Sequence, residues 1–230
     1  MTSMSIRLSK STVSSFLTCP MMFKNIFDGK KQVQNANMAF GSEMHFNIEQ
    51  FWKGIVIKDN QVCIPRLDSK DRYMKQSFTN FKKMIKIRWE TLKEKGDINK
   101  FVPQYIEQKF EGKFTLDDVD INLVGIIDMV DNFGEENDYI VEWKSGRMKD
   151  DYKWDIVYYC FLLKLNGINV HKGVVFYPYN GKIQIFTVSE SDIENLMGVF
   201  RDIIHHIKNN VWYHNPNCFC DSIQWEGENV

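Results

Sequence analysis

The sequence predicts a mixed α/β domain with one central β-sheet flanked by helices. The chain has 230 residues, a length that one large domain can accommodate. Hydrophobic residues make up 43% of it and charged residues 26%, which is ordinary for a globular protein with a core. Helical periodicity in about the first hundred residues gives way to alternating or apolar runs rich in β-branched residues, and this change predicts helices first and a sheet second.

The first part of the chain carries helical patterns. The elements expected there are a helix through SSFLTCPMMFKNIF capped by Ser9, Ser11 or Thr12, a helix over 38–52 with Phe40, Met44 and Ile48 on one face, an irregular or extended stretch over 54–68, and a long charged helix over 69–95 ending near Gly96. No internal repeat or linker separates this part from the rest.

The second part alternates strands and helices. The elements expected there are strands over 105–114, 119–132 and 138–143 with a turn at Asn132-Phe133-Gly134, a buried helix over 154–165, a hairpin of 173–177 and 182–188 around Asn180-Gly181, and a last amphipathic helix from Ser189 to about 209. Together these elements give one sheet covered by helices.

Charge and cysteine content limit the classes of function. The net charge of −1 means that any binding to nucleic acid needs a local basic groove. An odd number of cysteines, five, and no apolar leader predict free thiols in a reducing, intracellular compartment. No apolar run reaches about 18 residues, so we expect no membrane span.

Three charged residues fall where apolar residues belong. In IVEWKSG (140–146), Glu142 and Lys144 leave the same face of a strand. In LVGIIDMVD (123–131), Asp128 lies within an apolar strand, on one face with Ile126 and Val130. If the two strands pair, the carboxylates of Asp128 and Glu142 come close enough for one pKa to rise unless a cation neutralises them.

Paired carboxylates in an incomplete cage of oxygen ligands suit Mg²⁺, which keeps water molecules for a substrate. The plainer interpretation makes Asp128 and Glu142 sheet-edge charges, with Lys144 as their surface partner. We prefer the metal site because three charges on apolar strands occur together. An Asp…Glu-x-Lys pattern alone is weak, so the surrounding sequence matters.

GIIDMVD (125–131) followed by YIVEWKSG (139–146) resembles the G-x-x-D…(D/E)-x-K core of the PD-(D/E)XK nucleases. The resemblance is closest to the branch that contains the RecB and AddB nuclease domains and the CRISPR-associated exonucleases. LSKSTVSSFLTCPMMFK (8–24) resembles the opening helix of that branch, GSEMHFNIEQF (41–51) its histidine helix, and IEQKF (106–110) the glutamate-bearing strand before the core.

The resemblance implies a restriction-endonuclease-like α/β fold and hydrolysis of DNA. It implies that Asp128, Glu142 and Lys144 are catalytic and that Glu107 is an accessory acidic residue. It also implies one or two Mg²⁺ or Mn²⁺ ions held by His45, Asp128, Glu142 and the backbone carbonyl of Trp143. Lys144 is expected to position the attacking water and to offset charge in the transition state.

This chain departs from the family in two places. The family's Gln-x-x-x-Tyr becomes Asp155 and Tyr159, and we expect both residues to contact DNA. Some relatives hold a [4Fe–4S] cluster with four cysteines, but here only Cys19, Cys218 and Cys220 fit that pattern. We therefore expect no intact cluster unless Cys63, Cys160 or a non-cysteine ligand such as His214 supplies the fourth ligand. We expect a reduced cysteine pair in the tail, with Trp212, Phe219 and Trp225 packing the tail onto the N-terminal helix near Cys19.

Basic residues of the N-terminal part are candidates for contact with the DNA backbone, and a solvated helix face explains them equally well. The candidates are Lys24, Lys82, Lys83 and Lys86. His205, His206 and His214 with Cys218 and Cys220 fit no standard zinc spacing, so we expect no zinc site there. Motifs of phosphate-loop ATPases, dinucleotide enzymes and serine hydrolases are missing from the sequence.

By resemblance, the predicted function is a metal-dependent DNA exonuclease in recombination, repair or phage genome processing. The alternatives are a structure-specific endonuclease and a non-catalytic DNA-binding module with the same fold. We expect one domain over 1–230, with a helical N-terminal part (1–100), a catalytic core (101–190) and a C-terminal helix and tail (191–230). DNA is the expected partner, any partner protein is unknown, and the expected location is the cytoplasm, or the host cytoplasm if a phage encodes the protein.

Overall fold

A computed structural model describes residues 4–58, 61–132, 138–216, 218 and 220–226. The strands are β1 (Met4–Ser9), β2 (Val56–Lys58), β3 (Gln61–Cys63), β4 (Tyr105–Leu116), β5 (Val119–Asp131), β6 (Tyr139–Trp143), β7 (Lys172–Tyr177) and β8 (Lys182–Thr187). The helices are α1 (Lys10–Thr18), α2 (Pro20–Phe27), α3 (Ala36–Lys53), α4 (Arg72–Lys95), α5 (Tyr152–Leu165) and α6 (Glu190–Asn209), with 3₁₀ turns at Ile98–Lys100 and Cys220–Ser222.

The central sheet has six strands and is mixed, as the sequence predicted. β4 pairs antiparallel along almost the whole of one edge of β5. On the other edge, β1 runs parallel to residues 119–124 and β6 runs antiparallel to residues 129–131. β6 continues the sheet through parallel β7 and antiparallel β8. A gap at residues 125–128 of β5 therefore separates β1 from β6, and the last residues of both strands lie beside it.

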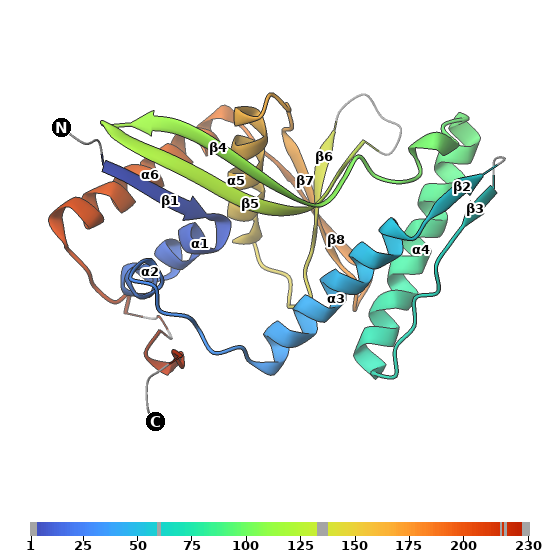
Figure 1. Cartoon of the computed structure of the whole chain (residues 1–230), viewed down its shortest axis with the longest axis horizontal. Coiled ribbons are helices and arrows are strands. Elements are labelled where there is room, and N and C mark those ends of the chain that lie inside the picture. Colours follow the sequence, from blue (N-terminus) through green and yellow to red (C-terminus); the bar gives the residue numbers. More distant parts are fainter. Residues whose placement is uncertain (1–3, 59–60, 133–137, 217, 219, 227–230) are drawn as a thin grey trace.

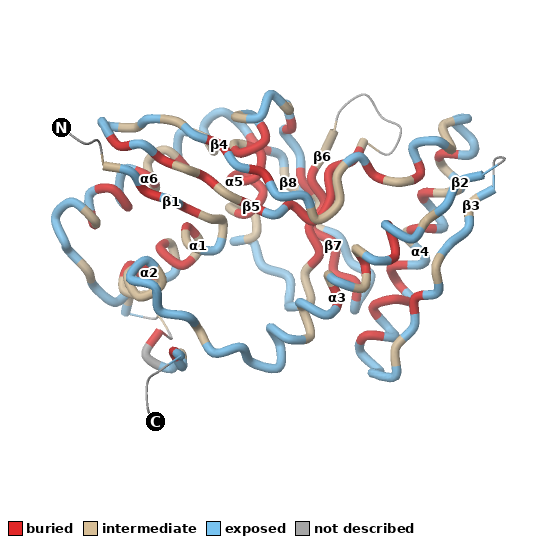
Figure 2. The backbone as a smooth tube through the Cα atoms, viewed as in Figure 1, coloured by how far each residue is buried: buried red, intermediate tan, exposed pale blue. Residues whose placement is uncertain are grey.

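Two hydrophobic clusters cover the sheet, and both appear as red stretches of the tube in Figure 2. One cluster packs strands β1 and β5 against helices α1, α5 and α6, and includes Leu8, Ile121, Tyr158 and Phe200. The other packs β5, β6 and β7 against α3 and α4, and includes Trp52, Phe81 and Trp143. In Figure 1 the first group of helices lies on the left and α3 and α4 lie on the right.

The expected helices and strands of the sheet are confirmed, with boundaries shifted by a few residues. The prediction missed β1, although Ile6 and Leu8 alternate with polar residues and are buried. The sequence also predicted one helix through SSFLTCPMMFKNIF, where the structure has two. α1 ends at Cys19, which is extended, and Pro20 starts α2 at the position where a missing N–H costs nothing.

The stretch over 54–68, expected to be irregular or extended, contains the short antiparallel hairpin β2–β3.

Ser9 caps α1 and Ser189 caps α6. In each case the serine side chain accepts a hydrogen bond from the backbone N–H of the third residue of the helix. Gly181 adopts a φ of 69° in the tight β7–β8 turn, a backbone conformation that suits glycine. The turn expected at 132–134 lies partly outside the described residues.

The C-terminal segment returns to the N-terminal helices, as Figure 1 shows beneath α2. Trp212 stacks on Phe23 of α2 with ring centroids 6.0 Å apart, and Trp225 is buried and forms an isolated bridge with Gln32. These two contacts agree with the predicted packing of the tail, whereas Phe219 lies outside the described residues. Among the described helices, none is both long enough and apolar enough to cross a bilayer.

Candidate active site

Asp128 lies in the gap that separates β1 from β6. The β5–β6 ladder ends at the pair Met129 and Val141, and the next pair in register would be Asp128 and Glu142. Instead, the backbone N–H of Trp143 donates to Oδ2 of Asp128 at 2.7 Å. The Asp128 side chain thus supplies an acceptor that a backbone carbonyl would otherwise provide, and its carboxylate is held beside the end of β6.

The strict alternation predicted for β5 is interrupted at this point. Ile127 and Val130 belong to the same core cluster, although three positions separate them. Ile126, which was expected to share the face of Asp128, is exposed to solvent. In the neighbouring strand Glu107 has a φ of 45°, which is rare for a residue other than glycine. Unusual backbone of this kind is often found at functional sites.

His45 joins the carboxylates of Glu107 and Asp128. Its Nδ1 lies 3.2 Å from Oε1 of Glu107 and 3.3 Å from Oδ1 of Asp128. One ligand atom from each of the three residues lies within 4.8 Å of the others. Gly41 lets helix α3 approach the loop after β6, because a Cβ there would stand 3.2 Å from Oγ of Ser145. The histidine predicted from α3 therefore meets the acidic strands.

The charge of His45 follows from these neighbours. Burial by itself lowers its pKa, but hydrogen bonds and charge interactions with Asp128 and Glu107 outweigh burial and raise the pKa to about 10. The imidazole without metal is therefore a cation at neutral pH. A divalent ion bound by these three residues would take the place of that proton.

Glu142 is almost fully buried, and its two carboxylate oxygens have different surroundings. Its Oε2 accepts from Nζ of Lys144 at 3.0 Å and lies 3.5 Å from Nζ of Lys10. Its Oε1 is buried and has no hydrogen-bond partner among the described residues. Burial and the nearby Asp128 raise the pKa of Glu142, and the two ammonium groups oppose this rise. A buried carboxylate oxygen without a donor fits a cation at this position.

Two lysines and two carboxylates form a compact ion network next to Glu142. Nζ of Lys144 donates to Oδ2 of Asp155 at 2.8 Å, and Nζ of Lys10 lies 3.5 Å from the same oxygen. Ser14 donates to the other oxygen of Asp155 at 3.2 Å. Burial raises the pKa of Asp155, but the two lysines and the hydrogen bonds outweigh burial and lower it. The same carboxylates overcome burial and raise the pKa values of both lysines.

Lys10 and Ser14 are not among the site residues that the sequence predicted. β1 ends at the gap, so the first residue of α1, Lys10, enters it from one side while Lys144 enters from the end of β6. The alternation of Ile6 and Leu8 was the available signal for β1. No local pattern shows that β1 pairs with β5, which lies more than 100 residues away.

Tyr159 and Asp155 face the site from α5. The hydroxyl of Tyr159 donates to the backbone carbonyl of Ile126 at 2.7 Å, within the stretch of β5 that separates β1 from β6. Its ring lies 5.3 Å from Nζ of Lys10. Burial and the nearby carboxylates raise the pKa of Tyr159. In this structure both side chains are engaged by protein groups, so contact with DNA stays a prediction for them.

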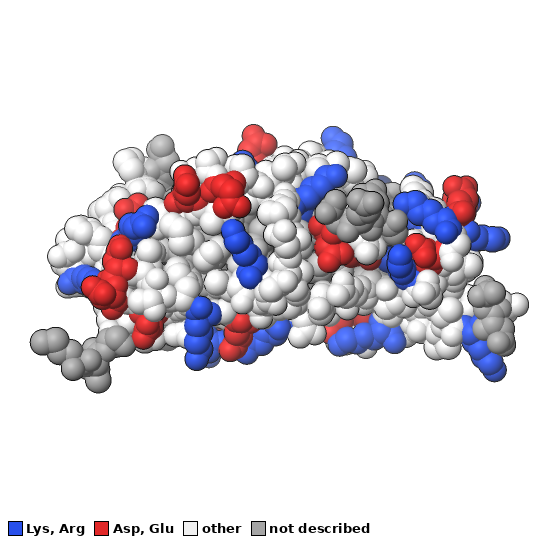
Figure 3. Space-filling model, turned by 90° about the horizontal axis from the view of Figure 1, so that it is seen from above, with Lys and Arg blue, Asp and Glu red and all other residues white. Residues whose placement is uncertain are grey.

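The predicted basic residues of the N-terminal part lie apart from these carboxylates. Lys86 pairs with Glu90 at 3.7 Å, and Lys83 donates to Oδ1 of Asn80 at 3.5 Å. Lys24 pairs with Asp28 and lies over the ring of Trp212, and Lys82 is exposed on α4. Figure 3 shows one face of the molecule, where blue and red side chains are interspersed and the described residues form no continuous basic stripe.

The donor set fits a hard divalent cation. Carboxylate oxygens of Asp128 and Glu107, a ring nitrogen of His45 and the unpartnered oxygen of Glu142 lie around the end of β6. Such oxygen-rich sets suit Mg²⁺ and Mn²⁺, and an imidazole ligand favours Mn²⁺ further. Glu107 belongs with His45 and Asp128 to one group of ligand atoms within 4.8 Å of one another, whereas Glu142 lies outside that group and beside the two lysines.

A family model described as "PD-(D/E)XK nuclease superfamily" matches residues 7–222. The chain belongs to this superfamily. The predicted α/β fold with its restriction-endonuclease-like sheet is thereby confirmed. Among solved structures, "Crystal structure of SSO0001" is similar at 13% identity and a TM-score of 0.40, over 89% of this chain and 77% of that one. No curated protein matches this superfamily member.

Proposed function

We propose that the chain is a Mg²⁺- or Mn²⁺-dependent deoxyribonuclease that hydrolyses phosphodiester bonds at DNA ends. Membership of the PD-(D/E)XK superfamily supports a metal-dependent nuclease. The observation that carries the proposal is the grouping of His45, Glu107 and Asp128, together with a buried, unpartnered oxygen on Glu142, whose carboxylate interacts with that of Asp128. In native structures most buried carboxylate oxygens of purely structural ion pairs do have a donor.

The proposed division of roles follows from the contacts. His45, Glu107, Asp128 and Glu142 hold the metal, and the backbone of Trp143 fixes Asp128. When bound there, Mg²⁺ or Mn²⁺ supplies polarisation of the scissile phosphate and a lowered pKa of a bound water.

The two ammonium groups that border Glu142 place positive charge where a phosphate would lie. Lys144 orients the attacking water and offsets negative charge in the transition state. Asp155 and Glu142 hold its ammonium in place through hydrogen bonds of 2.8 and 3.0 Å. Lys10 and Tyr159 complete the wall of the site from α1 and α5.

Action at DNA ends and a role in DNA processing are inferred from the sequence motifs. The opening helix, the histidine of α3 and Tyr159 resemble the RecB, AddB and CRISPR-associated exonuclease branch, which favours action at DNA ends in recombination, repair or phage genome processing. We also propose a single domain over 1–230 in three parts, and one family match over 7–222 supports the single domain. All five cysteines are free, in keeping with a reducing compartment.

The test uses end-labelled DNA in four forms: linear and circular, single-stranded and double-stranded. Each is incubated with Mg²⁺, with Mn²⁺ or with EDTA. We expect terminal nucleotides or short fragments from linear DNA with either ion, and no product in EDTA. Rapid cutting of closed circles would replace the exonuclease with an endonuclease. Binding without cleavage under every ion would identify a non-catalytic DNA-binding module.

A further inference from the structure

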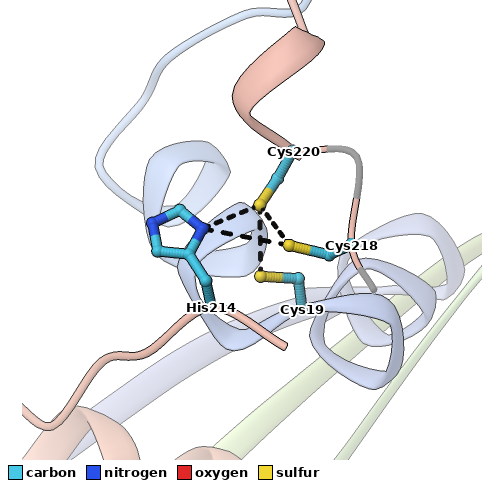
Figure 4. A group of neighbouring side chains, drawn as sticks. All are labelled: Cys19, His214, Cys218 and Cys220. Carbon is cyan, nitrogen blue, oxygen red and sulfur yellow. Dashed lines mark hydrogen bonds between the residues drawn. The ribbon is translucent and has the colours of Figure 1, made fainter. Parts of the chain in front are cut away.

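Three thiols and one imidazole converge between the two ends of the chain (Figure 4). Sγ of Cys19 lies 3.4 Å from Sγ of Cys220, which lies 2.6 Å from Sγ of Cys218. Nδ1 of His214 lies 2.9 Å from Sγ of Cys220 and 3.9 Å from Sγ of Cys218. One ligand atom from each of these residues lies within 4.8 Å of all the others.

The backbone holds this group together from both ends of the chain. Cys19 is the extended residue between α1 and α2, and it is completely buried. The N–H of Met21 donates to the carbonyl of Tyr213 at 3.2 Å, and the Asn215 side chain donates to the carbonyl of Thr18 at 2.7 Å. These bonds lie on either side of Cys19 and of His214, so the residues face each other without depending on their own side-chain contacts.

We propose that Cys19, His214, Cys218 and Cys220 bind one Zn²⁺ ion in a tetrahedral structural site. Zinc binds sulfur at about 2.3 Å and imidazole nitrogen at about 2.0–2.1 Å. Ligand atoms around one such ion stand roughly 3.5–3.8 Å apart by tetrahedral geometry. The Cys19–Cys220 and His214–Cys218 separations of 3.4 and 3.9 Å lie close to this range. Sγ of Cys218 and Nδ1 of His214 stand only 2.6 and 2.9 Å from Sγ of Cys220, so both would have to move away from it on metal binding.

The same geometry disfavours a [4Fe–4S] cluster and a disulfide. A [4Fe–4S] cluster takes four thiolates, and here the fourth ligand is the imidazole of His214. The four iron atoms also need a wider cage than ligand atoms within 4.8 Å of one another leave. A disulfide would use two of the sulfurs and leave the third beside an imidazole in a half-buried site, with nothing to explain the fourfold convergence.

The sequence predicted no zinc site in the tail, and the convergence of these four residues favours one instead. That expectation considered only C-terminal residues, whose spacing fits no standard site, and the missing ligand, Cys19, lies about 200 residues away. The ion would join α1 and α2 to the segment after α6. Its role would be structural, because Zn²⁺ with four protein ligands has no open position for a substrate.

The first test is the metal content of the full chain purified without oxygen, measured by elemental analysis. We expect about one zinc per chain, no stoichiometric iron, and the intense visible bands of tetrahedral thiolate-bound cobalt after replacement by Co²⁺. About four irons per chain with a brown colour would overturn the proposal. So would a metal-free protein that takes up no Co²⁺, or thiol titration that reveals a disulfide.

Variants assign the ion to this site. Cys218→Ser and His214→Ala should each lower zinc content well below one per chain and lower the Tm. Cys63→Ser is the matched control, because Cys63 is an exposed thiol on β3. His45→Ala separates this site from the carboxylate site and should keep its zinc. Loss of zinc in His45→Ala with full retention in Cys218→Ser would overturn the assignment.

Discussion

Glu142 and Asp155 are each bordered by two ammonium groups, and the two lysines differ in what else they touch. Lys144 hydrogen-bonds to both carboxylates and lies over the ring of Tyr152, whereas Lys10 lies 3.5 Å from each carboxylate and over the ring of Tyr159. This difference predicts different roles. Lys144 is oriented toward the carboxylate that would carry the metal, and Lys10 balances the charge of the pair from the other side.

Removing the metal-binding carboxylates should abolish activity. Asp128→Asn and Glu142→Gln each remove a negative charge that a divalent ion needs, so no cleavage of linear DNA is expected from either variant. Lys144→Ala should lower kcat by about 10²- to 10³-fold, because it removes one charged donor from the transition state. DNA binding of Lys144→Ala, measured by fluorescence anisotropy, should persist. A folded variant that cuts at the wild-type rate would show that the site is elsewhere.

Lys10 should matter less than Lys144 but measurably. In Lys10→Ala, the Lys144 ammonium alone balances the charges of Glu142 and Asp155. It is therefore less available to stabilise the charge of the reacting phosphate. We expect kcat to fall by the order of tenfold, with KM little changed and with partial recovery in Lys10→Arg. Lys182→Ala is the control, because Lys182 is exposed on β8. An unchanged kcat in Lys10→Ala would make Lys10 a structural charge only.

At the scale of single elements, α6 begins with a capping box whose charge is pH-dependent. The Asp192 carboxylate accepts from Lys153 and from the backbone N–H of Ser189, and these hydrogen bonds lower its pKa to about 2. In the unfolded chain, the pKa of an aspartate carboxyl is about 3.9. The stabilisation is therefore complete well above pH 4, and is lost as pH falls through the folded pKa.

Asp192→Asn should lower the free energy of unfolding by about 1 kcal/mol at pH 7. The difference from wild type should shrink between pH 4 and pH 2, because the wild-type carboxylate becomes protonated there. Urea unfolding at pH 7, 5 and 3 measures this. Asp202→Asn on the same helix is exposed and serves as the control. A difference that stays constant with pH would contradict the charge-based account.

Helix α5 leaves no room for a side chain at Gly173. A Cβ there would stand 2.4 Å from Cγ2 of Ile156 and under 3.0 Å from two more of its atoms. Gly173→Ala should cost about 1–3 kcal/mol of unfolding free energy through overpacking. In an Ile156→Ala background the same substitution should cost little or become favourable, since the conflicting atoms are gone. Equal costs in both backgrounds, measured by denaturant unfolding, would rule out this contact as the cause.

The sequence predicted these elements where a local pattern determines them. The strands through Asp128 and Glu142 alternate or run apolar, and the Asn180-Gly181 turn has its own signature. The break at Cys19 was missed because the helical pattern continues on both sides of Pro20. Lys10 and the partnership of Cys19 with the tail depend on contacts between distant segments, and no periodicity encodes such contacts.

At the scale of the whole molecule, the site lies between two cores. The cluster with α1, α5 and α6 supplies Lys10, Asp155 and Tyr159, and the cluster with α3 and α4 supplies His45 through its helix. β5 and β6 belong to both clusters, so the acidic residues lie where the two halves meet. The relative placement of the two cores should therefore affect the metal-binding geometry.

One buried ion pair fastens α4 to the sheet. The Arg88 guanidinium forms a fork with Asp131 at the end of β5, with Nη2 to Oδ1 at 3.1 Å. Nε and Nη2 of Arg88 also donate to the carbonyls of Phe101 and Lys100 at 2.7 and 2.6 Å. The side chain of Arg88 is fully buried and that of Asp131 almost so. One guanidinium thus donates to the carboxylate and to both carbonyls.

Removing one member of this pair should therefore destabilise the whole molecule. Asp131→Ala leaves a buried guanidinium without its counter-charge and should lower the free energy of unfolding by about 3–5 kcal/mol. Arg88→Met removes the guanidinium that neutralises the Asp131 carboxylate and should cost about the same. The double variant Arg88→Met/Asp131→Leu should cost much less than the sum of the single losses, because no buried charge then lacks a partner. Additive losses in denaturant unfolding would show that Arg88 and Asp131 stabilise their own segments independently, and that their pairing does not join α4 to β5.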